Sequence, residues 1–232
     1  MKPLVNRWAL VTGASRGIGQ QVAQALAEEG CRLILHSRTL DATAPLADRL
    51  RSQGTHVHTV AAELSDSAAV LRLAAEVSAL CGGTLDILYN NAALMTPYHA
   101  DWLSVVPADY ELSFRVNTIA PILLSNHFLP AMLAQGWGRI VNVTSGIKDQ
   151  PELMAYAASK AALDKFVRDT APKLAGTGVT MNLLDPGWLR TDLGGPNAPG
   201  AVESVLPGAL VPVLATDGVS GRWVSAQDFA GV

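Results

Sequence analysis

The stretch WALVTGASRGIGQQVAQALAEEG, residues 8–30, decides the fold that the sequence predicts. It opens with a short apolar run ending in Thr-Gly, and a segment of helical periodicity follows. The turn between them, TGASRGIG (12–19), carries glycines at 13, 17 and 19, which allow a tight turn, close backbone approach to a phosphate and close packing of helix on strand. Many turns are glycine-rich for backbone reasons alone. At the positive end of a helix dipole, however, this turn predicts an anion site suited to pyrophosphate.

The same alternation continues outward along the chain. Apolar runs that read as strands cover residues 32–37, 55–63, 85–93, 138–145 and 179–187, and helical segments cover 44–54, 66–83, 107–136 and 152–178. Apolar strands without strict alternation, each followed by a helix, are typical of a parallel sheet buried on both faces. The last 40 residues are rich in Gly and Pro, and residues 220–229 read as a closing strand. We therefore expect one α/β domain over residues 1–232, a doubly wound (Rossmann) parallel sheet of about seven strands with helices on both faces.

Composition and charge exclude several classes of protein. The net charge is −3 with no basic cluster, so binding to nucleic acid or to an anionic membrane is not expected. No apolar run reaches the ~20 residues of a membrane span. Cys31 and Cys81 form no CxxC pair, which favours a reducing, cytoplasmic setting. His56 and His58 share a strand face without a Cys or carboxylate at metal spacing, so no metal site is expected.

The end of the second strand indicates which dinucleotide would bind. Chains that bind NAD often place Asp or Glu here to hold the ribose 2′-hydroxyl, whereas this chain has Ser37 followed by Arg38. Arg16 lies inside the glycine turn. Two guanidinium groups near the ribose favour a 2′-phosphate, so NADP(H) is predicted over NAD(H). The alternative interpretation treats them as two solvated surface arginines.

Six motifs in order extend the comparison to nearly the whole chain. They are TGASRGIG (12–19), NNAA (90–93), VNTIAP (116–121), IVNVTS (140–145), YAASK (156–160) and DPGWLRT (185–191). In this order and spacing the chain resembles the short-chain dehydrogenase/reductase family, and is carbonyl-reductase-like. The resemblance implies hydride transfer between a nicotinamide and a carbonyl or alcohol, an activity of the class EC 1.1.1.-.

The resemblance also implies a catalytic set whose chemistry is intelligible. Reduction of a carbonyl leaves an alkoxide that needs a proton, and a free Tyr has a pKa near 10, too high for reversible acid–base work at neutral pH. Lys160, one helical turn after Tyr156, together with an oxidised nicotinamide, would lower that pKa and bond the ribose hydroxyls. Ser145 would hold the carbonyl oxygen, and the backbone of Asn117 would anchor a water of the proton relay. Pro121 would bend the helix there. Taken singly, each residue also has a purely structural interpretation.

The family positions that match a cofactor site carry over one at a time. Asn91 and Ala92 end the fourth strand, and Glu63 stands where Asp usually contacts adenine. The Leu189 backbone would bind the carboxamide, and Thr191 would bind the carboxamide or a phosphate. The expected cofactor set is Gly13, Ser15, Arg16, Gly17, Ile18, Gly19, Ser37, Arg38, Glu63, Leu64, Asn91, Ala92, Tyr156, Lys160, Pro186, Gly187, Leu189 and Thr191.

Three departures from the family pattern concern the surroundings of the site. Ala93 replaces a usual Gly, which would be strained if the backbone φ were positive. Glu63 is longer than Asp by a methylene. The interval from Ser145 to Tyr156 is shorter than the family usually has, which trims a loop that borders the substrate.

Substrate and partners follow less directly. The segment 188–210 is expected to be the substrate loop region, and an apolar pocket favours a neutral small-molecule ketone, aldehyde or alcohol; the same residues also fit core packing. The candidate lining is Leu94, Met95, Ile147, Leu153, Trp188 and Leu193. The resemblance implies a homodimer or homotetramer formed through the two long helices, for which Leu112, Val116, Phe166 and Val167 are candidates unless they face the sheet. The alternative function is a catalytically silent NADP(H)-binding sensor or scaffold.

Overall fold

A single parallel sheet organises the chain. The structure is a computed structural model that describes residues 4–231. The strands follow the order β3-β2-β1-β4-β5-β6-β7, and every pairing is parallel. Their bounds are β1 (Trp8–Val11), β2 (Arg32–Ser37), β3 (Val57–Ala61), β4 (Ile87–Asn90), β5 (Gly138–Val143), β6 (Val179–Asp185) and β7 (Trp223–Ser225). The chain winds outward from β1 to β3 and then crosses to β4, so the predicted doubly wound sheet of seven strands is confirmed.

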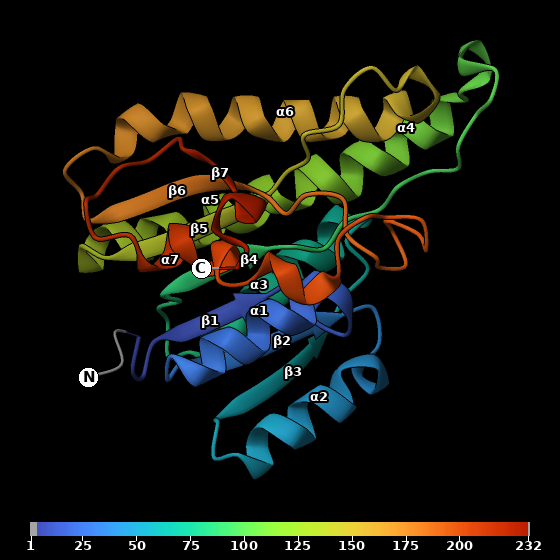
Figure 1. The fold of residues 1–232 in the computed structure, drawn as a ribbon. Helices are drawn as coiled ribbons and strands as arrows, with labels where there is room; N and C mark the ends of the chain where they lie inside the picture. Colours follow the sequence, from blue (N-terminus) through green and yellow to red (C-terminus); the bar gives the residue numbers. More distant parts are fainter. Residues whose placement is uncertain (1–3, 232) are drawn as a thin grey trace.

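Helices cover both faces of this sheet (Figure 1). Their bounds are α1 (Gly17–Glu28), α2 (Leu40–Ser52), α3 (Ser67–Leu80), α4 (Pro107–Phe114), α5 (Ala120–Gln135), α6 (Met154–Thr170) and α7 (Val211–Leu214). Apolar residues of α1, α2 and α7 share one core with the sheet, and those of α3, α5 and α6 share the other. Short 3₁₀ turns complete the chain at Trp102–Ser104, Pro151–Leu153, Ala171–Leu174, Val202–Val205, Gly208–Leu210 and Ala226–Phe229.

The strands are buried on both sides, which explains their continuous apolar runs. In β1 all four residues are buried; Ala9 and Val11 face the core under α1, and Leu10 faces the core under α3 and α5. Both faces of a central parallel strand need apolar side chains, because helices cover both. The small residues of α1, Ala23 among them, allow that helix to lie close to the sheet.

The segment predicted as one helix over 107–136 is interrupted. A π-helical turn, Arg115–Ile119, separates α4 from α5. Pro121 follows that turn and has no N–H to donate to a carbonyl one turn back. The sequence predicts a simple bend at this proline. The structure instead has a local change to π-helical hydrogen bonding. By length and composition alone, the stretch 107–135 would pass for a membrane-crossing helix. Half of its most apolar window is buried inside the protein, and α5 packs against α3 and β5, as a core helix does.

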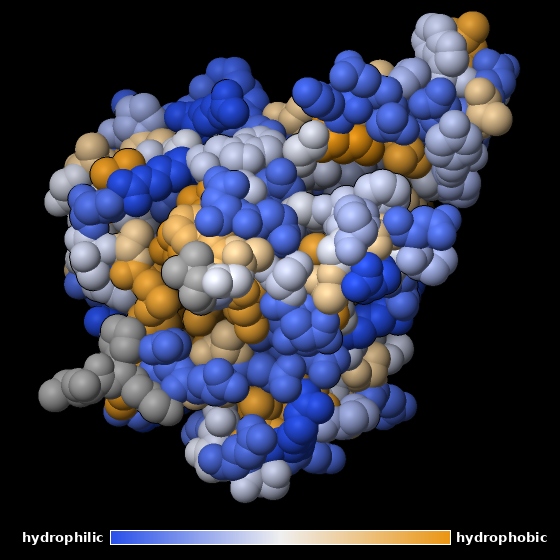
Figure 2. All heavy atoms as spheres, in the orientation of Figure 1, coloured by the Kyte–Doolittle hydropathy of each residue, from blue (hydrophilic) through white to orange (hydrophobic). Residues whose placement is uncertain are grey.

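The last part of the chain closes one edge of the sheet. Of the strand predicted at 220–229, only Trp223–Ser225 pairs with β6, and a 3₁₀ turn follows it. The preceding segment folds back over β4, where the buried Tyr89 hydroxyl donates to the Ala209 carbonyl oxygen at 2.8 Å. On the face drawn in Figure 2, apolar side chains gather in the region of α7.

The Tyr89 bond gives a test of how the last segment is held. Replacing Tyr89 by Phe leaves the buried Ala209 carbonyl without its partner, which costs about 1–3 kcal/mol. We expect the midpoint of thermal unfolding to fall by roughly 2–4 °C per kcal/mol lost in a chain of this size. The matched control is Tyr98→Phe, because Tyr98 is exposed and should tolerate the change. An equal midpoint for the two variants would contradict this account.

Candidate active site

The glycine turn between β1 and α1 has the geometry of an anion cradle. Gly13 and Gly17 adopt positive φ angles of 65° and 58°, which side-chain-bearing residues rarely adopt. A Cβ on Gly19 would lie 2.3 Å from the Gly13 carbonyl oxygen and 2.5 Å from Asn91 Nδ2. Only a glycine therefore lets α1 start this close to β4. The first N–H groups of α1 face the turn, as a bound phosphate requires.

Thr12 and Asn91 join the turn to the end of β4. The Asn91 side chain donates from Nδ2 to the Thr12 carbonyl at 2.9 Å and to the Gly13 carbonyl at 3.2 Å. The backbone N–H groups of Asn91 and Ala92 both donate to Thr12 Oγ1 at 3.0 Å. Thr12 is not among the residues predicted from the sequence, although its place directly before the first glycine of the turn could have indicated it. Ala93 has no positive φ, so this departure from the family pattern causes no backbone strain.

His36 is a second residue that sequence reasoning missed. The Gly13 N–H donates to its Nδ1 at 3.3 Å, and its Nε2 lies 3.1 Å from the Ala62 carbonyl oxygen. These partners assign the neutral tautomer with hydrogen on Nε2. Burial lowers the pKa of His36 from 6.5 to about 4, so the ring stays neutral and holds the start of the glycine turn. Its position inside β2 made it look like an ordinary strand residue.

The residues expected near the ribose and adenine lie at the same edge. Arg38 is exposed and takes part in no ion pair within residues 4–231, whereas Arg16 Nε lies 2.8 Å from Asp192 Oδ2. The Ser37 hydroxyl is buried and donates to the Thr39 carbonyl. Glu63 accepts from the backbone and hydroxyl of Ser65 at 2.9 and 3.0 Å, so its carboxylate braces its own loop. In the same region Ser15 and Ile18 are half-buried in the turn and Leu64 is buried in the core.

The four predicted catalytic residues meet at the carboxyl edge of the sheet. Tyr156 and Lys160 lie on α6, and the Lys160 ammonium is 5.8 Å from the centre of the Tyr156 ring. Lys160 Nζ donates to the Val143 carbonyl at 2.7 Å, two residues before Ser145. The Asn117 side chain, in the π-helical turn, pairs with both backbone groups of Leu94 and donates to Ser159 Oγ at 3.0 Å. Asn117 thus ties the end of β4 to the helix that carries Tyr156.

Burial is the largest influence on the pKa values of Tyr156 and Lys160. Burial raises the pKa of Tyr156, hydrogen bonding with Ser145 lowers it, and the charge of Asp185 raises it. The net effect raises the pKa of Tyr156. The protein's own residues therefore do not produce the lowered tyrosine pKa that the sequence predicts. Burial lowers the pKa of Lys160 to about 8, and the nearby Asp164 carboxylate opposes that shift. Both shifts favour the neutral forms of the two groups.

The turn after β6 closes the site from the side of the C-terminal segment. Gln227 donates to the Pro186 carbonyl at 2.8 Å, and a Cβ on Gly187 would lie 2.7 Å from Gln227 Cγ. Leu189 is buried, and Thr191 Oγ1 accepts from the Gly194 N–H at 3.0 Å. A Cβ on Gly17 would lie 3.4 Å from Thr191 Cγ2, so this loop contacts the glycine turn. Gln227 was not predicted, because nothing nearby in the sequence marks it.

The candidate pocket and interface residues divide by exposure. The expected lining residues are half-buried or exposed, and the Trp188 ring is 60% exposed with its Nε1 donating to the Gly194 carbonyl. Of the interface candidates, Leu112 is exposed, while Val116 and Val167 are buried in the core and Phe166 packs against it. Val116, Phe166 and Val167 therefore face the body of the protein, which is the alternative given for them in the sequence analysis.

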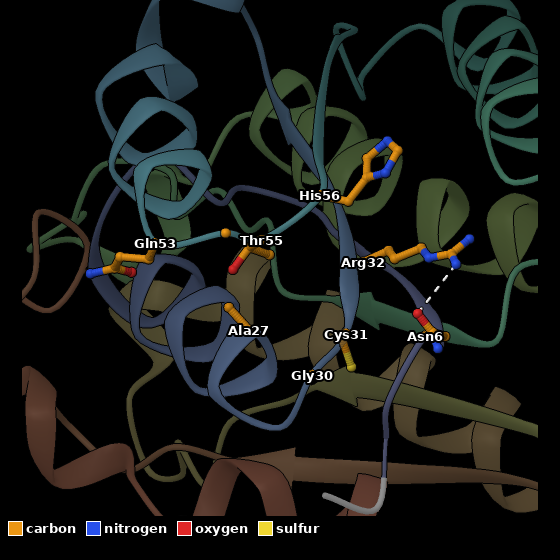
Figure 3. Close-up of a pocket in the computed structure, with 9 residues that line it drawn as sticks. Asn6, Ala27, Gly30, Cys31, Arg32, Gln53, Thr55 and His56 are labelled. Carbon is orange, nitrogen blue, oxygen red and sulfur yellow. Dashed lines mark hydrogen bonds between the residues drawn. The ribbon is translucent and has the colours of Figure 1, made fainter.

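A separate hollow of about 540 Å³ lies at the opposite ends of the strands, beside the starts of β1, β2 and β3 (Figure 3). Its lining is polar, and Arg32 Nη2 donates to Asn6 Oδ1 at 3.2 Å beside it. None of the predicted catalytic or cofactor residues lines it. His56 also borders it, with its Nε2 3.2 Å from that of His58, yet residues 4–231 contain no group of three or more candidate metal ligands.

Comparison with known proteins identifies the family. The family model for short chain dehydrogenase matches residues 7–200, and the chain belongs to this family. The NADPH-dependent aldehyde reductase-like protein of Arabidopsis thaliana is 31% identical over 97% of this chain and 92% of its own. A putative NAD(P) dependent gluconate 5-dehydrogenase of Beutenbergia cavernae, solved with NADP, has a TM-score of 0.85 at 30% identity and covers 97% of this chain and 96% of its own. A carbonyl reductase from chicken fatty liver, solved with NADPH, has a TM-score of 0.84 at 28% identity and covers 97% of this chain and 98% of its own.

The neutral state of His36 predicts a pH dependence of stability. The unfolded chain takes up the proton near pH 6.5, but the folded chain resists it until about pH 4, so stability is complete above 6.5 and falls as the pH drops. Between pH 7.5 and 5 the wild type should lose about 2 kcal/mol of unfolding free energy through this group. His36→Asn supplies an acceptor near the Nδ1 position without titrating, and should lose less. Urea unfolding at the two pH values measures this; equal losses in both proteins would contradict it.

Proposed function

We propose that this protein is an NADP(H)-dependent carbonyl reductase, which reduces a ketone or aldehyde to an alcohol or catalyses the reverse. The observation that carries the proposal is the meeting of Ser145, Tyr156, Lys160 and Asn117 at the carboxyl edge, beside the glycine turn. An adjacent anion cradle and a buried acid–base group fit a dinucleotide on one side and a carbonyl on the other. The names of the related aldehyde reductase-like protein and carbonyl reductase support this class of substrate.

In this proposal the Tyr156 hydroxyl donates the proton. Bound NADPH would supply the hydride that the carbonyl carbon accepts. The C=O π electrons move to oxygen, Ser145 holds that oxygen by a hydrogen bond, and the Tyr156 O–H bond breaks to deliver the proton. A raised tyrosine pKa keeps the phenol protonated, which suits the direction of reduction at neutral pH.

Lys160 and Asn117 act on the position and charge of Tyr156. Lys160 is anchored by the Val143 carbonyl, and its pKa of about 8 places it near the point where it can carry or release a proton. When charged, it stabilises the phenolate left after each turnover. Asn117 fixes the start of the segment after β4 against α6, so the substrate side and the tyrosine keep one relative position. The role expected from the sequence uses only the backbone of Asn117, whereas the contacts described here are made by its side chain.

Replacing Tyr156 by Phe tests the acid–base role. We expect kcat to fall by about 10²–10⁴, the range that general acid catalysis supplies, because the ring packing stays but the proton is lost. The dissociation constant for NADPH, followed by the fluorescence of the nucleotide, should change little. NADPH binding by the wild type without turnover on a panel of ketones and aldehydes would instead support the catalytically silent sensor or scaffold. Full activity in the variant would remove Tyr156 from the mechanism.

The choice of NADP(H) rests on Arg38 more than on Arg16. Arg38 is exposed and carries no ion-pair partner within residues 4–231, whereas Arg16 already pairs with Asp192. No carboxylate stands at Ser37 to repel a 2′-phosphate. The NADP found with the related gluconate 5-dehydrogenase and the NADPH found with the related carbonyl reductase support the same choice.

Replacing Arg38 by Asp tests the cofactor assignment. The change removes a charge-assisted contact worth about 1.5–3 kcal/mol, so KM for NADPH should rise about tenfold to a hundredfold while KM for NADH falls or stays. Arg49→Asp is the matched control, because Arg49 is exposed on α2, farther along the same segment. An unchanged ratio of the two KM values in Arg38→Asp would assign the 2′-phosphate to other residues.

The remaining assignments belong to the same proposal. The substrate would lie between the segments after β4, β5 and β6, with 188–210 as its loop region. Two free, buried cysteines fit a reducing cytoplasmic compartment. A homodimer or homotetramer is supported by apolar side chains exposed on the segment before α4, where Trp102 and Leu103 are 53% and 73% exposed. Figure 1 shows this segment projecting beyond the sheet.

A further inference from the structure

Asp185 places a carboxylate at the centre of the carboxyl edge. It is the last residue of β6, and the strand beside it ends next to Ser145, since the Thr144 N–H donates to the Leu184 carbonyl at 2.8 Å. One carboxylate oxygen, Oδ1, accepts from the Gly187 N–H at 3.0 Å and forms the turn after β6. The other oxygen, Oδ2, lies 2.6 Å from where a Cβ on Gly146 would be. Because Gly146 has no side chain, Oδ2 is turned toward the start of the 146–153 loop.

No cation neutralises this carboxylate. Within residues 4–231, Asp185 takes part in no ion pair and Oδ2 accepts no hydrogen bond, although the residue is half-buried. Lys160 donates to Val143, and the Asp164 carboxylate is bonded to the Thr144 hydroxyl. Burial is the main cause of the raised pKa of Tyr156 and of Asp164, and the charge of Asp185 adds a smaller upward contribution to the pKa of each, so this carboxylate acts on the candidate acid–base group.

We propose that Asp185 is a specificity-determining residue of the substrate site, whose free carboxylate oxygen favours carbonyl compounds with a cationic group and rejects anionic ones. This inference rests on the proposed reductase function and names its substrate class by charge. A bare carboxylate oxygen beside the carbonyl position attracts a positive group, whereas a substrate carboxylate would lie beside a like charge without a cation to offset it. The bond to Gly187 needs only one acceptor oxygen, which an amide would also supply, so the turn does not account for a charged carboxylate at this position.

Three aldehydes of nearly the same shape test the inference. They are 4-(trimethylammonio)benzaldehyde, methyl 4-formylbenzoate and 4-formylbenzoate, which carry a positive, a neutral and a negative group. With the wild type, kcat/KM should fall in that order, and the Asp185 charge should contribute about a tenfold part of the spread at low salt. Asp185→Asn keeps an oxygen for the Gly187 N–H but removes the charge, so the spread of kcat/KM should shrink by about tenfold relative to the wild type. Comparing variant with wild type for each compound cancels the intrinsic reactivities of the aldehydes, which also follow the electron withdrawal of their para groups. Asp169→Asn, which removes an exposed carboxylate near the end of α6, should leave the order unchanged.

Two further measurements keep the outcome decisive. Raising the salt concentration should narrow the order in the wild type itself, which tests the charge even where Asp185→Asn does not fold. Binding of the three compounds to the protein–NADPH complex, followed by nucleotide fluorescence, gives the same comparison without turnover. Binding in order of charge without turnover would overturn the proposed reductase function and uphold the role of Asp185. Turnover with the same spread of kcat/KM among the three compounds in wild type and Asp185→Asn would uphold the function and overturn that role.

Discussion

The close contact between the glycine turn and the end of β4 is the constraint on which the site depends. Gly19 packs so tightly on the Gly13 carbonyl and on Asn91 that no side chain fits between them. Asn91 and Thr12 then hold the two strand ends together through four hydrogen bonds. Since β1 and β4 are neighbours at the point where strand order reverses, this contact fixes the start of α1 at the crevice. The anion cradle is thus a consequence of how the two halves of the sheet join.

A second dependence links α6, which carries Tyr156 and Lys160, to the burial of charge. Lys160 is almost fully buried, and its one anchor is a backbone carbonyl, so the ammonium is costly in this place. The lowered lysine pKa and the raised tyrosine pKa are two results of the same removal from water. A site that only had to be stable would not bury a lysine beside a phenol. The arrangement is understandable where the groups exchange a proton and need their neutral forms within reach.

Sequence predicted the sheet, because it follows from local patterns, and the same patterns supplied the candidate site residues. Apolar runs and glycine turns mark strands and helix ends, and the family motifs fix the positions of Ser145, Tyr156 and Lys160. What could not be predicted depends on contacts between distant segments. His36 supports Gly13 across two strands, and Gln227 supports Pro186 from the last turn of the chain. The π-helical turn was not predicted either, although Pro121 directly follows it; within the turn, Asn117 bonds to Leu94 and Ser159, which are distant in the sequence.

The candidate substrate and cofactor sides of the site differ in how much change of sequence they tolerate. The proposed cofactor site is built partly from backbone groups and glycines, which tolerate few changes because a Cβ at Gly13 or Gly19 would collide with neighbouring atoms. Around the substrate position, loops of varied length meet, and one residue can alter the electrostatics without moving the frame. Gly146 and Asp185 illustrate this: a missing side chain on one strand end makes room for a carboxylate oxygen on the next. Either residue changed alone would crowd or empty the same space, so the two have to be considered as one feature of the site.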